Sequence, residues 1–389
     1  MHVLNVNMSF DAVEGGGTVE RTVQMSRHLA QNGISCTVLA TDLGWSQVRA
    51  KDFEGVEVIA LPCLWKRYYI FKPAIRRIRD AVARADVVHL MGHWTLLNAV
   101  VYLFARHFRK PYVVCPAGAL LIFGRSRSLK HIYNILIGRR IMRRAARCIA
   151  VTRNELPHFQ RYGVTLDRVT VIPNGIDPQH FTGPGDGTFL ARIGQDEVPF
   201  VLFMGRLNLI KGPDLLLRAF AGLGLEFKRH HLVFAGPDDG MLADLRALAA
   251  ESSVQSRVHF VGYLSGDDKA CAYRAAQLVA VPSRQEAMSI VVLEAGCAGK
   301  PVLITDQCGF EEVGYAGGGW VVPPTVEALR GALVAILNDQ SALAEHGRIL
   351  RRMVLERFQW TAIVSQYLLL YDQVLYDHQS AGSIGVGSI

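Results

Sequence analysis

Two glutamates stand eight positions apart in the stretch PSRQEAMSIVVLEAG, residues 282–296. Glu286 follows a Pro-Ser turn, whereas Glu294 lies in an apolar run that predicts a buried helix. On one helix eight residues rise about 12 Å, which exceeds the roughly 5–9.5 Å between the carboxylates of hydrolytic pairs. We therefore expect the two carboxylates to hold separate groups of an extended ligand, with Glu294 accepting hydrogen bonds from a vicinal diol such as a ribose. A capping charge and a satisfied core polar group are the alternative.

A second candidate is the loop within FMGRLNLIKGPDLLLRAF, residues 203–220. Arg206 and Lys211 flank it, just before a helix expected to begin near Pro213. Two cations at a helix N-terminus are electrostatically unfavourable unless an anion joins them, so the loop predicts an anion site. Solvated side chains are the alternative. The loop is not a Walker A motif, because no G-K-[ST] is present.

A third candidate is the glycine run Gly15, Gly16 and Gly17 in SFDAVEGGGTVERT, residues 9–22. Consecutive glycines let backbone N–H groups approach an anion at the N-terminus of the helix that follows. A plain glycine turn explains the run equally well. The pattern is not G-x-G-x-x-G, so it gives no support for a nicotinamide cofactor.

The elements that position these loops alternate between short apolar runs and helical patterns. Such alternation predicts parallel sheets covered on both faces, which makes the fold class α/β and doubly wound. The expected strands are 3–8, 35–40, 56–60, 86–90, 111–115, 147–151, 168–172, 199–204, 231–235, 257–261, 277–281, 301–304 and 319–322. Ligands of such sheets bind at the carboxyl ends of strands, where the three loops lie.

The polar, glycine-rich stretch HFTGPGDGTFLARIGQDE, residues 180–197, predicts the break between two domains. We expect an N-terminal domain over 1–180, a linker over 181–197 and a C-terminal domain over 198–358. The chain length of 389 residues agrees with two domains.

Composition restricts the cellular setting. The seven cysteines form no C-x-x-C pair and no zinc-ligand cluster, which favours reduced thiols in the cytoplasm. The first residues, MHVLNVNMSF, predict a strand and lack the charged and apolar regions of a signal peptide. No apolar stretch reaches the roughly 20 residues that a membrane-spanning helix needs.

Charge is unevenly distributed along the chain. Residues 1–190 hold 25 Lys and Arg against 13 Asp and Glu, whereas the remainder holds 17 basic against 21 acidic residues. Two stretches, 66–84 and 125–148, mix basic residues with apolar ones at helical spacing. Helices of this kind bind anionic bilayers, so we expect a cytoplasmic protein that associates peripherally with the inner face of the membrane. A solvated basic face is the alternative, and no motif supports nucleic acid as a partner.

An ordered set of motifs resembles glycosyltransferase family 4 over nearly the whole chain. The set comprises the glycine loop, VIPNGID (171–177), GRLNLIKG (205–212), FAGPDD (234–239), VHFVGYLS (258–265), E-x7-E within 282–296, GKPVLITDQCGFEEV, GGGWVVPP and FQWTAIVSQYLLLY. The resemblance implies the GT-B fold, with two facing Rossmann-like domains and a final helix, 360–377, that crosses back to the N-terminal domain. It also implies retaining sugar transfer from a nucleotide-diphosphate sugar.

The resemblance implies roles for four side chains. Arg206 and Lys211 would hold the donor diphosphate and act as electrophilic catalysts. Glu286 would hold hydroxyls of the transferred sugar, and Glu294 would bind the ribose. Because the chain has no D-x-D motif, we expect no metal and no cofactor, the nucleotide-sugar being a substrate.

Further contacts implied by the resemblance come from the backbone and from the base-binding region. These donor-site candidates are Gly16, Gly17, Tyr263, Met288, Ser289 and Ile290. Asn174 and Asp238, within two of the matching motifs, are added as further candidates.

Two departures from the family pattern put parts of the site in question. Many members have E-G-F-G where this chain has Glu286-Ala287-Met288-Ser289. Many also have a histidine near the transferred sugar at the position of Ala117. His93, at another strand end, is a candidate substitute, but a core or capping role explains it as well.

The expected acceptor is a saccharide or a polyprenyl-linked saccharide, used in the assembly of a cell-surface polysaccharide or glycolipid. A sugar-nucleotide epimerase or hydrolase on the same fold is one alternative, but no acid–base cluster appears in the N-terminal half. A non-catalytic nucleotide-binding protein is another, although it would have no reason to keep Arg206, Lys211, Glu286 and Glu294 together.

Overall fold

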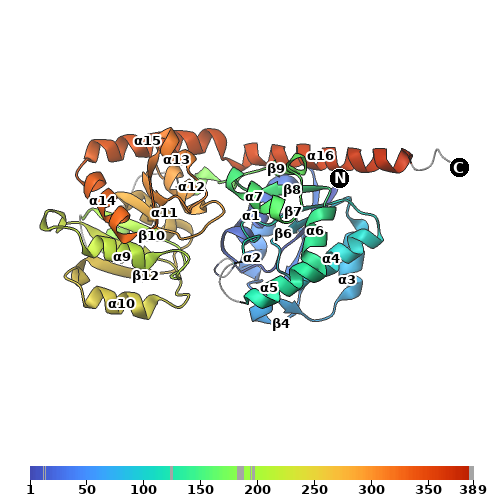
Figure 1. Ribbon diagram of the computed structural model, residues 1–389, viewed down its shortest axis with the longest axis horizontal. Helices are drawn as coiled ribbons and strands as arrows, with labels where there is room; N and C mark the ends of the chain where they lie inside the picture. Colours follow the sequence, from blue (N-terminus) through green and yellow to red (C-terminus); the bar gives the residue numbers. More distant parts are fainter. Residues whose placement is uncertain are drawn as a thin grey trace. The chain divides into compact units, whose positions relative to one another are not determined.

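The computed structural model describes residues 1–11, 13, 15–122, 126–181, 188–192, 194 and 198–384. The chain divides into two compact units: in Figure 1 the N-terminal one is coloured from blue to green, with a final red helix, and the C-terminal one from green to orange-red. The N-terminal unit comprises Met1–Gly175 and the segment that begins at Trp360, and the C-terminal unit comprises Ile176–Gln359. The boundary therefore precedes the expected domain end at residue 180. Residues 181, 188–192 and 194 of the expected linker belong to the C-terminal unit, and its other residues lie outside the described ones.

The N-terminal unit is built on a seven-stranded parallel sheet of order β3-β2-β1-β6-β7-β8-β9. Its strands are β1 (His2–Val6), β2 (Ser35–Thr41), β3 (Glu57–Leu61), β6 (Val87–Met91), β7 (Tyr112–Cys115), β8 (Arg147–Ala150) and β9 (Val169–Val171). Its helices are α1 (Gly16–Gln31), α2 (Gln47–Ala50), α3 (Ile75–Arg84), α4 (Leu96–His107), α5 (Arg127–Tyr133), α6 (Arg139–Arg144), α7 (Leu156–Arg161) and α16 (Trp360–Ile384).

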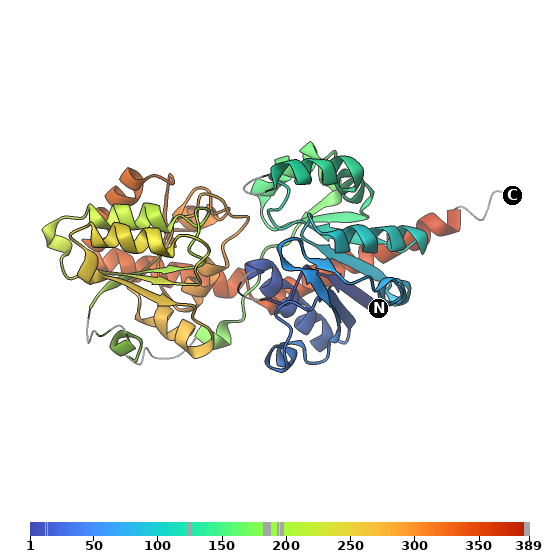
Figure 2. The same ribbon diagram turned by 90° about the horizontal axis from the view of Figure 1, so that it is seen from below.

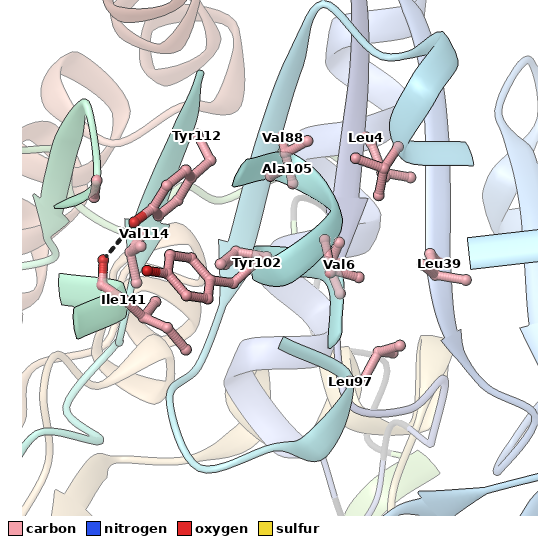
Figure 3. Packing of buried hydrophobic residues seen from close by; sticks show 14 of the residues in the cluster. Leu4, Val6, Leu39, Val88, Leu97, Tyr102, Ala105, Tyr112, Val114 and Ile141 are labelled. Atoms are coloured by element: carbon pink, nitrogen blue, oxygen red, sulfur yellow. Dashed lines mark hydrogen bonds between the residues drawn. The ribbon is translucent and has the colours of Figure 1, made fainter. Parts of the chain in front are cut away.

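One face of this sheet packs against α3, α4 and α6 in the core shown in Figure 3. Leu4 and Val6 of β1 belong to this core together with Leu97, Tyr102 and Ala105 of α4. Tyr112 also belongs to this core, and its buried hydroxyl donates a 2.8 Å hydrogen bond to the carbonyl of Ile141. Burying such a hydroxyl without a partner would cost free energy, so the bond makes the aromatic residue compatible with the core.

The final helix of the chain belongs to the N-terminal unit. In Figures 1 and 2, α16 runs along this unit, where it packs against α1 and β6. Buried polar groups join them: Arg21 of α1 donates to the hydroxyl of Tyr367, and Nδ1 of His89 lies 2.7 Å from the hydroxyl of Tyr371. The helix extends to Ile384, beyond the predicted end at residue 377.

The C-terminal unit contains a six-stranded parallel sheet of order β12-β11-β10-β13-β14-β15. Its strands are β10 (Phe200–Met204), β11 (His231–Ala235), β12 (Val258–Gly262), β13 (Leu278–Val281), β14 (Val302–Thr305) and β15 (Gly319–Val322). Its helices are α8 (Thr188–Arg192), α9 (Pro213–Ala221), α10 (Leu242–Ala250), α11 (Gly266–Ala275), α12 (Ile290–Cys297), α13 (Glu312–Ala316), α14 (Val326–Leu337) and α15 (Gln340–Arg357).

Both faces of the second sheet are buried. Val201 and Phe203 of β10 join the core formed with α9, α10 and α14. Phe200 and Leu202 alternate with them and are also fully buried, as expected when helices cover the other face too. Burial of both faces explains why the strand segments of the sequence are apolar at consecutive positions.

Two short strands were missed. β4 (Cys63–Trp65) and β5 (Ile70–Phe71) form a small antiparallel pair that the sequence did not predict. Leu64 and Trp65 in it are largely exposed, so the apolar pattern of a buried strand is absent. No helix in the described part of the chain is long and apolar enough to cross a membrane.

Candidate functional site

The candidate site of the C-terminal unit lies where the strand order of its sheet reverses. From β10 the chain proceeds outward to β11 and β12, whereas β13, β14 and β15 lie on the other side of β10. All six strands are parallel, so the loops that follow them leave the same edge of the sheet. Loops that follow the two strands at such a switch point diverge and leave room for a ligand. Here those are the loops after β10 and β13.

Lys211 and Glu286 come from these two loops and form an ion pair. Nζ of Lys211 lies 2.8 Å from Oε1 of Glu286, and the two side chains are 25% and 9% exposed. Ser283 donates a 2.5 Å hydrogen bond to the same oxygen, and the amide of Glu286 donates to the carbonyl of Gln307. Groups that follow β10 and β13 therefore hold the carboxylate, and a group that follows β14 holds the backbone of the same residue.

A second ion pair fixes the two loops against each other. Arg284 donates to both carboxylate oxygens of Asp214, at 2.8 and 2.7 Å, and to the carbonyl of Leu209. Such a two-pronged contact is geometrically specific. Gly212 has a φ of +69°, and a Cβ there would lie 2.1 Å from the carbonyl oxygen of Pro282. Only glycine allows this close approach, which brings Lys211 beside Glu286.

Arg206 lies near the start of the loop that follows β10, whereas Lys211 lies near its end. Its guanidinium is 3.3 Å from Oδ2 of Asp239, which also accepts a 2.8 Å hydrogen bond from Asn208. Asn208 in turn accepts from the backbone amide of Lys211, so the loop is internally braced. The residue before Asp239, Asp238, has other partners. Its Oδ1 accepts hydrogen bonds from three backbone amides at the start of α10. These hydrogen bonds to the ionised carboxylate lower the pKa of Asp238.

Glu294 is buried inside α12 and both of its oxygens have partners. Lys269 lies 2.7 Å from Oε1, and the hydroxyl of Tyr273 donates a 2.5 Å hydrogen bond to Oε2. Both partners come from α11, and Tyr273 is fully buried. Burial, followed by the carboxylate of Glu294, raises the pKa of the Tyr273 phenol well above its usual value. Sequence reasoning missed Lys269 and Tyr273, because no motif marks α11.

The start of α12 contains the residues whose backbone amides were predicted to contact the ligand. Ser289 caps the helix without a side-chain hydrogen bond to its backbone, and its buried hydroxyl has no partner among the described residues. Met288 is buried and Ile290 is half-buried beside it. Tyr263, directly after β12, is 50% exposed. Its loop leaves the same edge of the sheet as the loops that contain Arg206 and Glu286.

The N-terminal unit has its own switch point, between β1 and β6. Gly16 and Gly17 follow β1 and open α1, whose N-cap, Gly15, provides no side-chain hydrogen bond. Gly16 is half-buried with a φ of +52°, and Gly17 is exposed. The uncapped start of a helix of 16 residues is electrostatically suited to an anion.

His93 follows β6 but is almost completely enclosed. Its ring is 2% exposed and packs against the rings of Trp94, Tyr133 and Tyr162. Nε2 lies 3.0 Å from Oδ1 of Asn134, and burial lowers the pKa of His93 to about 4. In this structure the imidazole is a neutral core group that does not reach the surface of the unit.

Asn174 is also part of the interior of the N-terminal unit. Its side-chain oxygen accepts a 2.6 Å hydrogen bond from Arg21, which also donates to the carbonyl of Ile172 and to Tyr367. Arg21 of α1 thus connects the segment that follows the last strand of the first sheet to α16. Within the described residues, no group of three or more His, Cys, Asp or Glu side chains could hold a metal ion.

The arrangement in the C-terminal unit can bind an anion and a polyol side by side. Arg206 and Lys211 provide the cations, and the carboxylates of Glu286 and Glu294 can accept hydrogen bonds from hydroxyl groups.

Comparisons with known proteins identify the family. A family model described as Glycosyltransferase Family 4 matches residues 15–180, and one described as Glycosyl transferases group 1 matches residues 191–352. The D-inositol 3-phosphate glycosyltransferase of Nocardia farcinica is 32% identical over 87% of this chain and 78% of its own length. An uncharacterized glycosyltransferase of Methanocaldococcus jannaschii is also 32% identical, but the chain spans only about half of its length, 54%, and the match covers 53% of this chain.

A solved structure shows the same fold. The crystal structure of the Anabaena protein HepE in complex with UDP and glucose superimposes with a TM-score of 0.80 at 19% identity, covering 96% of this chain and 100% of that one. Sequence and fold agree: this chain belongs to glycosyltransferase family 4, the glycosyl transferases group 1, and has the GT-B fold with two Rossmann-like units.

Proposed function

We propose that this protein transfers a sugar from a nucleoside-diphosphate sugar to a saccharide or lipid-linked saccharide, with retention of anomeric configuration. The observation that carries the proposal is the Lys211–Glu286 pair at the switch point of the second sheet. It places a cation suited to a phosphate beside a carboxylate suited to sugar hydroxyls. Family membership supports the same reaction.

In the proposed reaction, the bond between the anomeric carbon and the diphosphate oxygen breaks. A bond from the acceptor oxygen forms on the same face of the sugar, and the acceptor proton passes to the departing phosphate oxygen. Negative charge grows on the diphosphate as it leaves. Arg206 and Lys211 would stabilise that charge with little reorganisation, because the carboxylates of Asp239 and Glu286 already position the two cations.

Glu286 would orient the transferred sugar, and Glu294 would bind the ribose. Backbone amides at Ser289 and Ile290, at the start of α12, would add donors for the sugar or phosphate. Glu294 is held by Lys269 and Tyr273, so its carboxylate is preorganised. Preorganised groups lose little entropy when a ligand binds.

We further propose that the donor is a UDP-sugar, because HepE was solved with UDP and glucose. The acceptor would be a polyprenyl-linked saccharide at the inner face of the cytoplasmic membrane, for cell-surface polysaccharide or glycolipid assembly. D-inositol 3-phosphate, named for the Nocardia relative, is the soluble acceptor to compare with it. The excess of basic residues in residues 1–190 suits either anionic acceptor.

A nucleotide-binding assay tests the donor half of this proposal. UDP, GDP and ADP would be screened by thermal shift, with and without magnesium, on the wild type and on Arg206→Ala combined with Lys211→Ala. We expect a rise in melting temperature with UDP that the double variant loses. Lys228→Ala combined with Arg229→Ala, two exposed cations of the same unit, is the matched control. A UDP shift that persists in the Arg206 and Lys211 variant would refute the assigned diphosphate site.

A further inference from the structure

One helical segment of the N-terminal unit has an unusual outer face. α5 (Arg127–Tyr133), a π-helical turn (Asn134–Gly138) and α6 (Arg139–Arg144) follow one another without a break. Their buried residues recur at helical spacing: Asn134, Gly138, Ile141 and Met142. The segment therefore presents one face to the unit and the opposite face to solvent.

Large aliphatic side chains gather on the solvent side of this segment. Leu129 is 51% exposed, Ile132 51%, Ile135 76% and Leu136 64%. A single exposed aliphatic residue needs no explanation, but four within eight positions of one helical run form a patch. Packing inside the unit does not account for them, because the segment buries its other face.

Positive charge without a counterion adjoins the patch. Arg139, Arg140 and Arg144 are exposed, and none of them has a salt bridge within the described part of the chain. The sequence contains no Asp or Glu between Asp86 and Glu155. The other basic helix, α3, differs, because Arg84 pairs with Glu57.

We propose that this face, Leu129–Arg144, binds an anionic lipid bilayer. The arginines would contact lipid phosphates, and the aliphatic side chains would enter the boundary between head groups and acyl chains. The inference deepens the proposed function, on which it rests, by bringing the protein to the surface where a lipid-linked acceptor resides. The partner is the bilayer, and Leu129–Arg144 is the segment that contacts it.

Other occupants fit less well. A second copy of the chain using the same face would place two arginine clusters against each other, which is electrostatically unfavourable. A nucleic acid would neutralise the arginines but would leave the aliphatic side chains in water. A bilayer interface satisfies both kinds of side chain at once.

The test is co-sedimentation of the purified full chain with vesicles. Vesicles of phosphatidylcholine with phosphatidylglycerol would be compared with vesicles of phosphatidylcholine alone, at low and high salt. We expect binding to the anionic vesicles that weakens with salt. One basic residue near an anionic surface raises the binding affinity about fivefold. Arg139→Gln with Arg140→Gln should therefore bind the anionic vesicles at least tenfold more weakly than the wild type. Ile135→Ser with Leu136→Ser should also lose binding to the anionic vesicles, including the binding that the wild type retains at high salt.

Matched controls come from the other unit. Lys228→Gln with Arg229→Gln removes two exposed charges, and Leu225→Ser removes an aliphatic side chain that is 87% exposed. Neither should change vesicle binding. Equal losses in the controls, binding to both vesicle types alike, or no binding by the wild type would overturn the proposal. A dimer in light scattering that Ile135→Ser with Leu136→Ser abolishes would also overturn it, in favour of a second copy.

The UDP thermal shift, measured on the same variants, separates this proposal from the proposed function. If the vesicle-binding variants keep the UDP shift but lose binding to vesicles, the surface and the donor site are independent and both stand. If wild type binds vesicles but no nucleotide, the donor assignment fails and the surface stands. If it binds UDP but not vesicles, only the surface assignment fails.

Discussion

Lys211 and Glu286 lie 2.8 Å apart, Nζ to Oε1, although each follows a different strand of the C-terminal sheet. β10 and β13 are adjacent in that sheet, and the strand order reverses between them. The Arg284–Asp214 pair and the tight approach at Gly212 keep the two loops together. The pair is thus a product of the topology, and it concentrates a cation and a carboxylate at the place where ligands of such sheets bind.

Glu286→Gln tests the role of the carboxylate in transfer. The amide keeps the shape of the side chain but accepts hydrogen bonds from sugar hydroxyls more weakly. We expect the rate of sugar transfer to fall by about 10²–10³-fold, as when one preorganised electrostatic contact is removed. The UDP thermal shift should be retained, because Arg206 and Lys211 remain.

The measurement is release of UDP from a UDP-sugar in the presence of acceptor. Glu345→Gln is the control, since Glu345 forms an exposed pair with Arg348 on α15. Transfer by Glu286→Gln at the wild-type rate would show that the carboxylate does not orient the sugar.

Tyr273→Phe tests the support of Glu294. The change removes the hydrogen bond that the buried phenol donates to Oε2 and leaves that oxygen without this partner. A hydrogen bond to a charged group contributes about 1.5–3 kcal/mol, so the free energy of unfolding should fall by that amount. We also expect KM for the donor to rise while kcat changes little, because the role proposed for Glu294 is ribose binding alone.

The control is Tyr376→Phe, at a tyrosine of α16 that is 70% exposed. It should change neither stability nor KM. A Tyr273→Phe protein with lower stability but unaltered KM would make Tyr273 a core residue alone.

The strands could be predicted closely because burial on both faces leaves a continuous apolar run. Residues 199–204 and 277–281 were expected as strands, and β10 and β13 occupy Phe200–Met204 and Leu278–Val281. The hairpin of β4 and β5 escaped prediction because its strands have three and two residues and expose Leu64. Short, exposed strands leave no periodic pattern.

The sequence indicated which residues belong to the candidate site, but not which of them contact each other. Spacing singled out Lys211 and Glu286 separately, yet only the strand order shows that their loops are neighbours. Lys269 is four positions before Tyr273 on α11, so both lie on one face of that helix, but nothing in the sequence directs that face to Glu294. Similarly, only loop geometry distinguishes Asp239, which contacts Arg206, from Asp238.

Gly212→Ala tests the geometry of the β10 loop. Alanine is strained at a φ of +69°, and its Cβ would lie 2.1 Å from the carbonyl oxygen of Pro282. The loop must move, so we expect a loss of stability of at least 1–3 kcal/mol, the range for a residue held in a sparsely populated backbone conformation, together with a weaker UDP shift. Chemical denaturation measures the loss of stability.

Gly331→Ala, within α14, is the matched control, because its Cβ would meet nothing within 4 Å. It should raise stability by about 0.5–1 kcal/mol, the usual gain from alanine in a helix interior. A Gly212→Ala protein as stable as the wild type, with the full UDP shift, would show that the close approach is unnecessary.

The environment of His93 predicts a dependence of stability on pH. Burial lowers the pKa of this residue to about 4, whereas an unfolded histidine titrates near 6.5. The unfolded chain therefore binds a proton at this site between about pH 6.5 and 4 that the folded chain does not. Its contribution to stability is complete above pH 6.5 and declines as the pH falls, by up to about 1.4 kcal/mol per pH unit.

His93→Gln removes this titration and should flatten the profile. Between pH 7 and 5 the variant should lose about 2 kcal/mol less unfolding free energy than the wild type, measured by urea denaturation at each pH. The remaining slope includes His89, whose pKa burial lowers to about 3. His131→Gln, at an exposed histidine of α5, is the control. Parallel profiles for His93→Gln and the wild type would show that burial does not lower the pKa of His93.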